Sequence, residues 1–280
     1  MPEWAAFVGL TGLLLTALLA LARLSQGALH TDGSGRPSAT DGLHPTSVAD
    51  GPDPTYPRFE TAEAAAQRRR LEEKVSVTNV DLSAGALFAN VALTQGLFGA
   101  LVVGGAFYFD IPARAFGITS APLSTGLPAV AIGVAAGVGF WVGNELAASL
   151  ADGFGVAVDE SLRELLAPDS LGGWVVLLGL VLPTIAVVEE LIFRGAAIGV
   201  PVTGLGAPAW AMAVVSSVAF ALGHGAQGRA GVLVTGALGL GLAGLFVVTD
   251  SLLVVIVAHY LVNALELVVH EGLGVDRLSL

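Results

Sequence analysis

Cysteine is absent from the 280-residue chain. Its absence excludes disulfide bonds, thiol nucleophiles and metal sites built on cysteine ligands. Lysine is nearly absent as well, since Lys74 is the only one. Lysine and arginine together number 12, against 23 aspartate and glutamate residues, and the formal net charge is -11. Nucleic-acid binding is disfavoured, because neutralising phosphates requires a basic face. An acidic surface with little lysine also suits concentrated salt, so the composition suggests a halophilic source.

Charged residues of both signs are scarce, at 12% of the chain, whereas soluble domains carry about a quarter. Hydrophobic residues make up 54%. Several apolar stretches reach the roughly 18 to 20 residues that cross a ~30 Å hydrocarbon core as a helix. They lack the alternation of barrel strands. The predicted fold class is therefore all-α, a polytopic transmembrane helical bundle of about seven spans, and we expect a multi-pass integral protein of the cell membrane with the lipid bilayer as its partner.

The predicted spans are Trp4 to Ala22, Leu82 to Phe109, Leu127 to Leu150, Trp174 to about Val200, Pro208 to Gly225, Ala230 to Val248 and Ser251 to Val269. The first of these could be a cleaved secretory signal, but its length and the lack of a basic leader favour a retained span. A polar linker rich in glycine and proline follows it, and ends in a short basic helix around Arg68 to Arg70. Asp250 and Ser251 are predicted to form an N-cap turn before the last span.

Glu189 and Glu190 are adjacent inside an apolar span, and Arg194 follows them. A charge at the centre of a bilayer costs at least about 2.5 kcal/mol, so each of these residues needs a partner or a purpose. Glu190 and Arg194 are four residues apart and share a helix face, which predicts an ion pair; direct contact with a substrate is the alternative. Glu189 points about 100° away and is left as the working carboxylate.

Two histidines on later spans complete the set of candidate residues. His224 ends the fifth span, with Phe220 one turn before it and expected to pack over the imidazole. His259 and Asn263 are four residues apart on one face of the last span. His30, His44 and His270 lie in polar or terminal stretches and are interpreted as solvated. The polar residues of the second and third spans are interpreted as interhelical or interfacial contacts: Asn90, Gln95, Asn144 and Glu145.

Two chemistries suit these residues, because the chain has neither a helical H-E-x-x-H zinc motif nor a G-x-S-x-G elbow. In the first, Glu189 and His224 hold and deprotonate a water that attacks a carbonyl, and His259 and Asn263 stabilise the oxyanion. In the second, Glu189, His224 and His259 bind a divalent metal such as zinc, which lowers the pKa of the water. The sequence leaves both open.

The three motifs are E-E-x-x-x-R at Glu189 to Arg194, F-x-x-x-H at Phe220 to His224 and H-x-x-x-N at His259 to Asn263. Their order on successive apolar segments resembles the CPBP family of intramembrane proteases. That family includes the type II CAAX prenyl endopeptidases and proteins linked to bacteriocin processing or immunity. The resemblance covers roughly Gly172 to Gly272. It implies a membrane-embedded endopeptidase acting on a membrane-associated protein, with prenylated CAAX-type substrates as one class.

The resemblance also assigns roles and domains. It implies that Glu189, His224 and His259 are catalytic or metal-binding and that Asn263 assists, beside the supporting residues Glu190, Arg194 and Phe220. We expect five segments, which are a first transmembrane helix (1–24), a polar linker (25–78), the second and third transmembrane helices (79–170), a catalytic membrane core (171–272) and a tail (273–280). No oligomeric state is predicted.

Two rival functions suit the same residues. A transporter or proton relay also needs intramembrane glutamate and histidine, although the chain shows no internal repeat. A catalytically silent scaffold or immunity protein would keep the motifs for packing. The three motifs must also lie at a similar depth in the membrane. If the fourth span ended at Arg194, the glutamates and His224 would lie near opposite membrane faces. We therefore expect that helix to continue past Arg194, or a re-entrant segment around Pro201 to Pro208.

Overall fold

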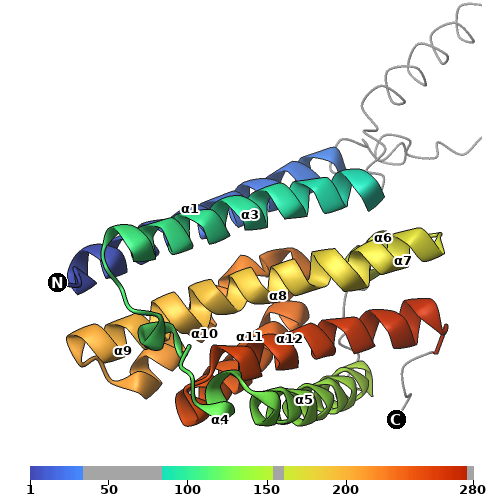
Figure 1. The fold of residues 1–280 in the computed structure, drawn as a ribbon. Helices are drawn as coiled ribbons and strands as arrows, with labels where there is room; N and C mark the ends of the chain where they lie inside the picture. The colour runs from blue at the N-terminus through green and yellow to red at the C-terminus, as the bar shows by residue number, and fades with distance from the viewer. Residues whose placement is uncertain (34–83, 154–160, 276–280) are drawn as a thin grey trace, which may run out of the picture. The chain divides into compact units, whose positions relative to one another are not determined.

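The structure is a computed structural model that describes residues 1–33, 84–153 and 161–275. All regular elements within these ranges are helical, which confirms the all-α prediction. The α-helices are α1 (Trp4–Gly33), α3 (Ala84–Tyr108), α4 (Pro122–Thr125), α5 (Leu127–Gly153), α6 (Ser161–Leu166), α7 (Leu171–Val176), α8 (Leu182–Glu190), α9 (Val200–Leu205), α10 (Ala209–Gly223), α11 (Gly228–Thr249) and α12 (Leu252–Leu267) (Figure 1). The 3-10 helices are η1 (Ala113–Phe116) and η4 (Gly225–Gln227), and the π-helices are η2 (Leu177–Val181), η3 (Leu191–Gly199) and η5 (Val268–Gly272).

Six stretches of helix in the described residues are long and apolar enough to cross a membrane. They are Trp4–Leu24, Phe88–Tyr108, Leu127–Leu150, Leu171–Leu205, Gly231–Thr249 and Leu252–Gly272. The seventh predicted span is the helix α10, whose 15 residues reach only about 22 Å at 1.5 Å per residue. The chain is a multi-pass integral membrane protein.

The fourth span is a single run of helical turns from Leu171 to Leu205, in which α7, η2, α8, η3 and α9 follow one another without a break. The prediction that this helix continues past Arg194 is confirmed. Both π-helical stretches end just before a proline, at Pro183 and at Pro201. A proline lacks the N–H that an α-helix requires, and wide π turns are common where the regular bonding pattern is interrupted.

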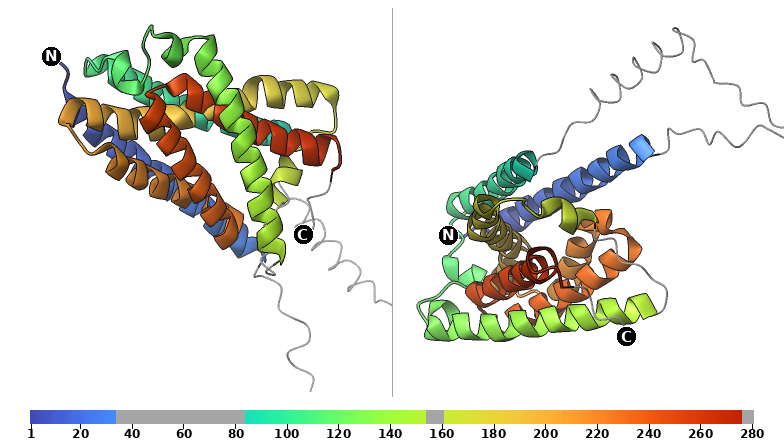
Figure 2. Two further views of the ribbon diagram at one scale, coloured as in Figure 1. Left: turned by 90° about the horizontal axis from the view of Figure 1, so that it is seen from below. Right: turned by 90° about the vertical axis from the view of Figure 1, so that its right-hand side faces the viewer.

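The last span lies between α5 on one side and the long fourth span on the other (Figures 1 and 2). It also contacts α11. Its start is fixed by Ser251, whose hydroxyl accepts a hydrogen bond from the Val254 N–H at 3.2 Å, as the predicted N-cap should. Asp250 ends α11 with a left-handed backbone at φ 45°. The α12 helix thus has helices on several sides, which suits a segment that carries polar side chains.

The first helix runs beside α3 (Figure 1) and is held near its N-terminus by aromatic packing. Phe7 is fully buried and meets Phe109 and Phe116 edge to face, with ring centroids at 6.5 and 5.7 Å. The helix extends to Gly33, beyond the predicted first segment. Most of the predicted linker and its basic helix lie outside the described residues, as do the side chains of His30 and His44.

Candidate active site

The predicted ion pair of the fourth span is present. Glu190 and Arg194 are both fully buried, and Arg194 Nη1 donates to Glu190 Oε1 at 2.8 Å. Arg194 Nη2 donates to the carbonyl oxygen of Gly239 on α11 at 2.9 Å. A side chain at Gly239 would put a Cβ 3.0 Å from the Phe220 ring, so glycine allows α11 to approach closely here. The pair therefore ties the fourth span to α11.

His259 joins this pair from α12. Its Nδ1 lies 2.7 Å from Glu190 Oε1, the same oxygen that accepts from Arg194. An ionised carboxylate only accepts hydrogen bonds, so Nδ1 carries the proton and Glu190 fixes the tautomer and the orientation of the ring. The other nitrogen, Nε2, then points its lone pair away from Glu190. It lies 3.8 Å from Glu189 Oε2.

Glu189 faces away from the ion pair, as the helical spacing predicted. Its Oε1 accepts a long hydrogen bond from Gln95 Nε2 on α3, at 3.4 Å. Its Oε2 is buried and has no hydrogen-bond partner. The Oε2 to His259 Nε2 distance of 3.8 Å is too long for a direct hydrogen bond, but one water can bond both atoms. This arrangement suits a carboxylate that activates a water.

His224 caps the C-terminus of α10, and its Nδ1 donates to the Phe220 carbonyl at 2.8 Å. A carbonyl only accepts, so the Nε2 of a neutral His224 is free to accept a bond. The Phe220 ring lies between the two imidazoles, 4.5 Å from that of His224 and 6.0 Å from that of His259. Arg194 Cζ lies 4.8 Å from the same ring, in a cation–π contact. The predicted packing of Phe220 over an imidazole is confirmed.

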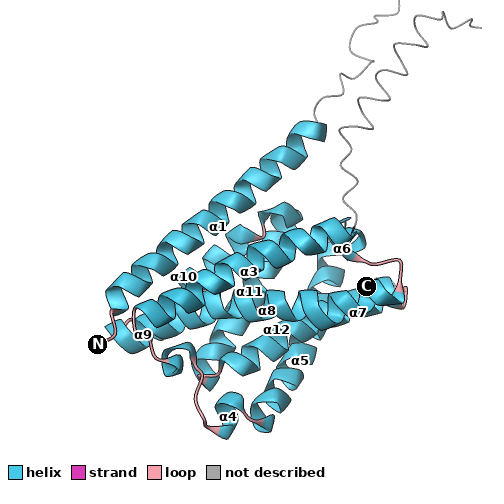
Figure 3. Cartoon of the chain, turned by 45° about the horizontal axis from the view of Figure 1, so that its top comes forward, coloured by secondary structure: helices cyan, strands magenta, loops and turns pink. Residues whose placement is uncertain are grey.

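A cavity of about 380 Å³ brings Glu189 and His224 to one space. Three polar side chains of α3 share it, namely Asn90, Thr94 and Gln95. The remaining wall is apolar and comes largely from α1, which lies beside α3 and α10 (Figure 3). Its lining residues are Leu18, Leu21, Ala22, Asn90, Thr94, Gln95, Phe98, Glu189, Phe193, Gly223 and His224. Part of the cavity therefore comes from helices distant in sequence from the three motifs.

The depths of Glu189 and His224 agree because α10 is short. The chain runs from Glu189 to the end of α9 at Leu205, turns, and returns along α10 from Ala209 to His224. The outward and return paths have nearly equal lengths in residues, so the two side chains reach the same level. The turn is tight, with Gly206 in a left-handed conformation at φ 67°. No re-entrant segment is needed between Pro201 and Pro208.

Asn263 lies one turn after His259 on α12 and is partly buried. It forms no hydrogen bond with any of the other predicted site residues. Its placement on the His259 face of the helix follows from the four-residue spacing.

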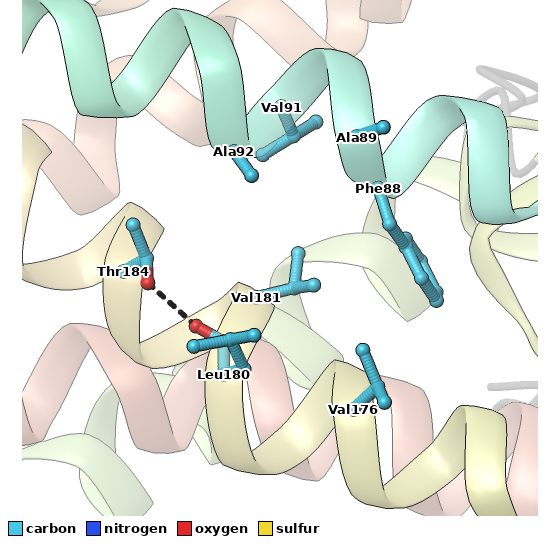
Figure 4. Close-up of a pocket in the computed structure, with 8 residues that line it drawn as sticks. All are labelled: Phe88, Ala89, Val91, Ala92, Val176, Leu180, Val181 and Thr184. Carbon is cyan, nitrogen blue, oxygen red and sulfur yellow. Dashed lines mark hydrogen bonds between the residues drawn. The ribbon is translucent and has the colours of Figure 1, made fainter.

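A second cavity, of about 270 Å³, lies between α3 and the first half of the fourth span (Figure 4). Its lining is almost entirely apolar, and the hydroxyl of Thr184 donates to the Leu180 carbonyl at 2.7 Å instead of facing the space. Thr184 precedes Glu189 by five residues, or roughly 7 to 8 Å along the helix. An apolar space therefore adjoins the polar one along the same two helices.

A three-ligand metal site does not fit Glu189, His224 and His259 as they stand. Within the described residues, one group of histidine and carboxylate side chains has three ligand atoms all within 4.8 Å of one another, and its members are Glu145, Glu266 and His270. Glu189 Oε2 and His259 Nε2 are close enough to share an ion, but His224 does not complete the set. Glu189 and His224 thus line one cavity, while Glu189 Oε2 and His259 Nε2 are separated by a distance that one water can bridge.

The prediction that His270 is solvated is wrong. Only 9% of the residue is exposed, and its Nε2 lies 3.0 Å from Glu145 Oε1. Gln95 forms an interhelical contact, one of the two interpretations made from the sequence, but the sequence did not identify Glu189 as its partner. The burial of His270 had an available signal in the sequence, because His270 follows Glu266 by four residues, the same spacing as that of His259 and Asn263. No signal in the sequence pairs α3 with the fourth span.

Comparison with known proteins agrees with the motif order. Residues 171–265 match the family described as Type II CAAX prenyl endopeptidase Rce1-like, a range that begins within one residue of the predicted Gly172 and ends before the predicted Gly272. No curated protein and no solved structure matches the sequence. The matched residues hold all three motifs, whereas α1, α3 and α5 lie outside them. The match covers about a third of the chain, and the three motifs of this membrane protein thus lie in a segment similar to the Rce1-like type II CAAX prenyl endopeptidases, a family of proteases.

Proposed function

We propose that the protein is an intramembrane endopeptidase in which Glu189 is the general base that activates a water. One observation carries the proposal. Glu189 Oε2 is buried without a partner, lies 3.8 Å from His259 Nε2 and belongs to a residue that shares a cavity with His224. A buried carboxylate oxygen left unbonded is costly unless a ligand or water completes it.

The proposed reaction begins with a water held between Glu189 Oε2 and His259 Nε2, with His224 Nε2 facing the same cavity. Glu189 accepts a proton as the water oxygen attacks the substrate carbonyl carbon. The carbonyl oxygen becomes an oxyanion, and Asn263 is proposed to stabilise it through its amide N–H groups, joined by His259 once Nε2 has gained the second proton of the attacking water. The C–N bond then breaks, and the proton held by Glu189 passes to the leaving amine. The products are a free carboxylate and a free amine.

Glu190 supports this reaction without touching the substrate. Its carboxylate orients His259 and balances any positive charge that the imidazole acquires in the transition state. Arg194 in turn neutralises Glu190, so the buried group carries no unpaired charge while His259 is neutral. A Zn²⁺ ion at these residues would supply Lewis-acid activation of the water, but the spacing of the three donors supports the carboxylate mechanism.

Prenylated CAAX-type proteins are the proposed substrate class. The apolar cavity between α3 and the fourth span adjoins the polar cavity that contains Glu189, so a lipid chain and a peptide bond could be held side by side. The family description names the same class of substrate. An isoprenoid in the apolar cavity would place the nearby C-terminal peptide bonds toward Glu189.

The test uses purified full-length protein in liposomes and a membrane-tethered reporter peptide, made with and without a prenyl group. Glu189→Gln and His224→Ala should each reduce cleavage by about 10²-fold or more, with an unchanged melting temperature. Glu164→Gln is the matched control, because Glu164 is exposed on α6, away from both cavities. Cleavage retained by Glu189→Gln would defeat the proposal. Equal cleavage of both reporters would defeat the substrate class alone.

A further inference from the structure

A second group of buried charged residues lies at the C-terminal ends of α5 and α12. Glu145 comes from α5, Glu266 from α12 and His270 from the π-helical turn η5. We call these three residues the Glu145 cluster. His270 Nε2 lies 3.0 Å from Glu145 Oε1 and 3.9 Å from Glu266 Oε2, and the three ligand atoms all lie within 4.8 Å of one another. None of the three belongs to the matched residues 171–265.

The hydrogen bonds of His270 point to a missing positive centre. Its Nδ1 lies 2.7 Å from the Val275 carbonyl oxygen, which only accepts, so Nδ1 carries the proton. The neutral imidazole then presents a lone pair at Nε2, 3.0 Å from a carboxylate oxygen that is also an acceptor. Only 4% of the His270 side chain is exposed, so bulk water cannot separate the two. Two facing acceptors at this distance require either a proton or a metal ion between them.

The surroundings of the cluster resemble the outer shell of a metal site. Arg163 of α6 donates from Nη1 to Glu266 Oε1 at 3.0 Å, and from Nε to Glu271 Oε1 at 2.7 Å. Its guanidinium therefore fixes Glu266 so that Oε2 is on the His270 side. Metal-binding histidines donate their second N–H to a carbonyl or carboxylate, and metal-binding carboxylates are themselves hydrogen-bonded. Val275 and Arg163 supply both kinds of support.

Charge balance favours a divalent ion over a proton. With His270 neutral, the charged groups that the described residues bring together here are the carboxylates of Glu145, Glu266 and Glu271 and the guanidinium of Arg163, and their sum is two negative charges. The side chains of the three carboxylates are each less than a fifth exposed. Net charge is costly where water is largely excluded. A divalent cation removes this excess completely, whereas one proton removes half of it.

We propose that Glu145, Glu266 and His270 bind a divalent transition-metal ion, with zinc as the best match. One imidazole and two carboxylates are common zinc ligands at about 2.0 to 2.2 Å. Two such ligands at near-tetrahedral angles lie roughly 3.4 Å apart, within the spread of the observed 3.0 and 3.9 Å. The imidazole disfavours Ca²⁺ and Mg²⁺, which prefer oxygen. The ion would join α5 to the end of α12, the helix that carries His259.

The test measures metal binding in a background that cannot bind metal at the motif residues. Full-length Glu189→Gln/His224→Ala protein is purified in detergent, stripped with chelator and titrated with Zn²⁺, and with Co²⁺ as a spectroscopic probe. About one ion per chain should bind, with the visible absorption of cobalt bound through nitrogen and oxygen. Zinc should also raise the melting temperature. This readout is independent of proteolysis, so failure of the proposed function would not affect it.

Substitutions in the same background assign the ion to the cluster. His270→Ala and Glu145→Gln should each abolish stoichiometric binding and the thermal shift, and Arg163→Gln should weaken binding about 10- to 100-fold. Glu164→Gln should bind as the background does. Glu145→Gln keeps the size of the side chain, so it remains informative if His270→Ala fails to fold. Undiminished binding in Glu145→Gln and His270→Ala would overturn the proposal. So would the absence of binding with a melting temperature that rises on acidification, because a proton would then fill the place of the ion.

Discussion

Two buried polar groups share the α12 helix, and they differ in what their carboxylates face. In the first, Glu190 Oε1 accepts from both Arg194 and His259, and each of Glu189 and Glu190 has one buried oxygen without a hydrogen-bond partner, but only Glu189 lines the cavity. In the second, Glu145, Glu266 and His270 face one another, with Arg163 bonded to the outer side of Glu266. The first group borders a cavity large enough for a substrate. The ligand atoms of the second group instead lie within 4.8 Å of one another.

The comparison teaches that residue types alone do not separate a reactive site from a binding site in a helical membrane bundle. Each group contains two glutamates, a histidine and an arginine. The distinguishing feature is whether a carboxylate oxygen opens onto a cavity or onto the other ligands. If this is correct, substitutions in the first group should mainly affect turnover, except at the ion pair, and those in the second should mainly affect stability.

The largest expected effect is at the ion pair itself. Arg194→Leu leaves Glu190 buried without its cationic partner, and breaking a buried pair in this way typically costs about 3 to 5 kcal/mol. We expect a large loss of monodisperse protein and a lowered melting temperature in detergent. The double variant Glu190→Leu/Arg194→Leu has no buried unpaired charge and should recover much of the stability while remaining inactive. A double variant no more stable than the single one would contradict the assignment of a structural pair.

The next effect contrasts the two histidines of the last span. His259→Gln should lower kcat/KM for the reporter by about 10²- to 10⁴-fold, because it removes the imidazole beside Glu189 Oε2. Its melting temperature should change little, since the amide can still donate to Glu190. His270→Gln should show the opposite balance, with the larger change in the melting temperature. If His259→Gln and His270→Gln changed kcat/KM and the melting temperature to the same extent, the proposed difference between the two groups would be contradicted.

A smaller effect is expected at Gln95, which belongs to α3 and lies outside the matched residues. Gln95→Leu removes the hydrogen bond to Glu189 Oε1 and should lower kcat by about tenfold, the value of one ordinary hydrogen bond. Thr94→Val is the matched control, because Thr94 lines the same cavity but bonds only the Asn90 carbonyl. If Thr94→Val lowers kcat as much as Gln95→Leu does, then Gln95 has no specific role in orienting Glu189.

The smallest effect is expected at Asp250, which lies outside both groups. Burial raises the pKa of the Asp250 carboxyl above its ordinary value, so the folded state disfavours the ionised form. The contribution of Asp250 to stability is therefore present below its unfolded pKa and is lost as pH rises through the raised pKa. Asp250→Asn, which also tolerates the left-handed backbone, should slightly raise the melting temperature at neutral pH. The gain should disappear near pH 4, and a gain that is constant with pH would contradict this cause.

Helical periodicity predicted the contacts that lie within one helix. The four-residue spacing of Glu190 and Arg194 gave the ion pair, and the same spacing placed Phe220 against His224. The continuation of the fourth span past Arg194 followed from the need to bring two motifs to the same depth. These inferences succeed because a helix fixes the relative directions of its own side chains.

Contacts between helices were not predictable in the same way. Nothing in the spacing of α3 indicates that Gln95 meets Glu189, because the sequence does not state which helices are neighbours. The burial of His270 was missed for a related reason, since its enclosure comes from α5 and from the Val275 carbonyl that folds back on it. The π-helical turns near Pro183 and Pro201 were not predicted from the sequence either, and are recognised only from the wider backbone path in the structure.

The N-terminal helix has one further consequence. Phe7 packs in the core near its start, while Leu18, Leu21 and Ala22, about three to four turns before its other end, form part of the wall of the cavity beside Glu189 and His224. The cavity is therefore bounded on one side by a part of the chain that carries none of the motif residues, and we expect that exchanging this helix would alter which molecules enter while leaving the chemistry intact.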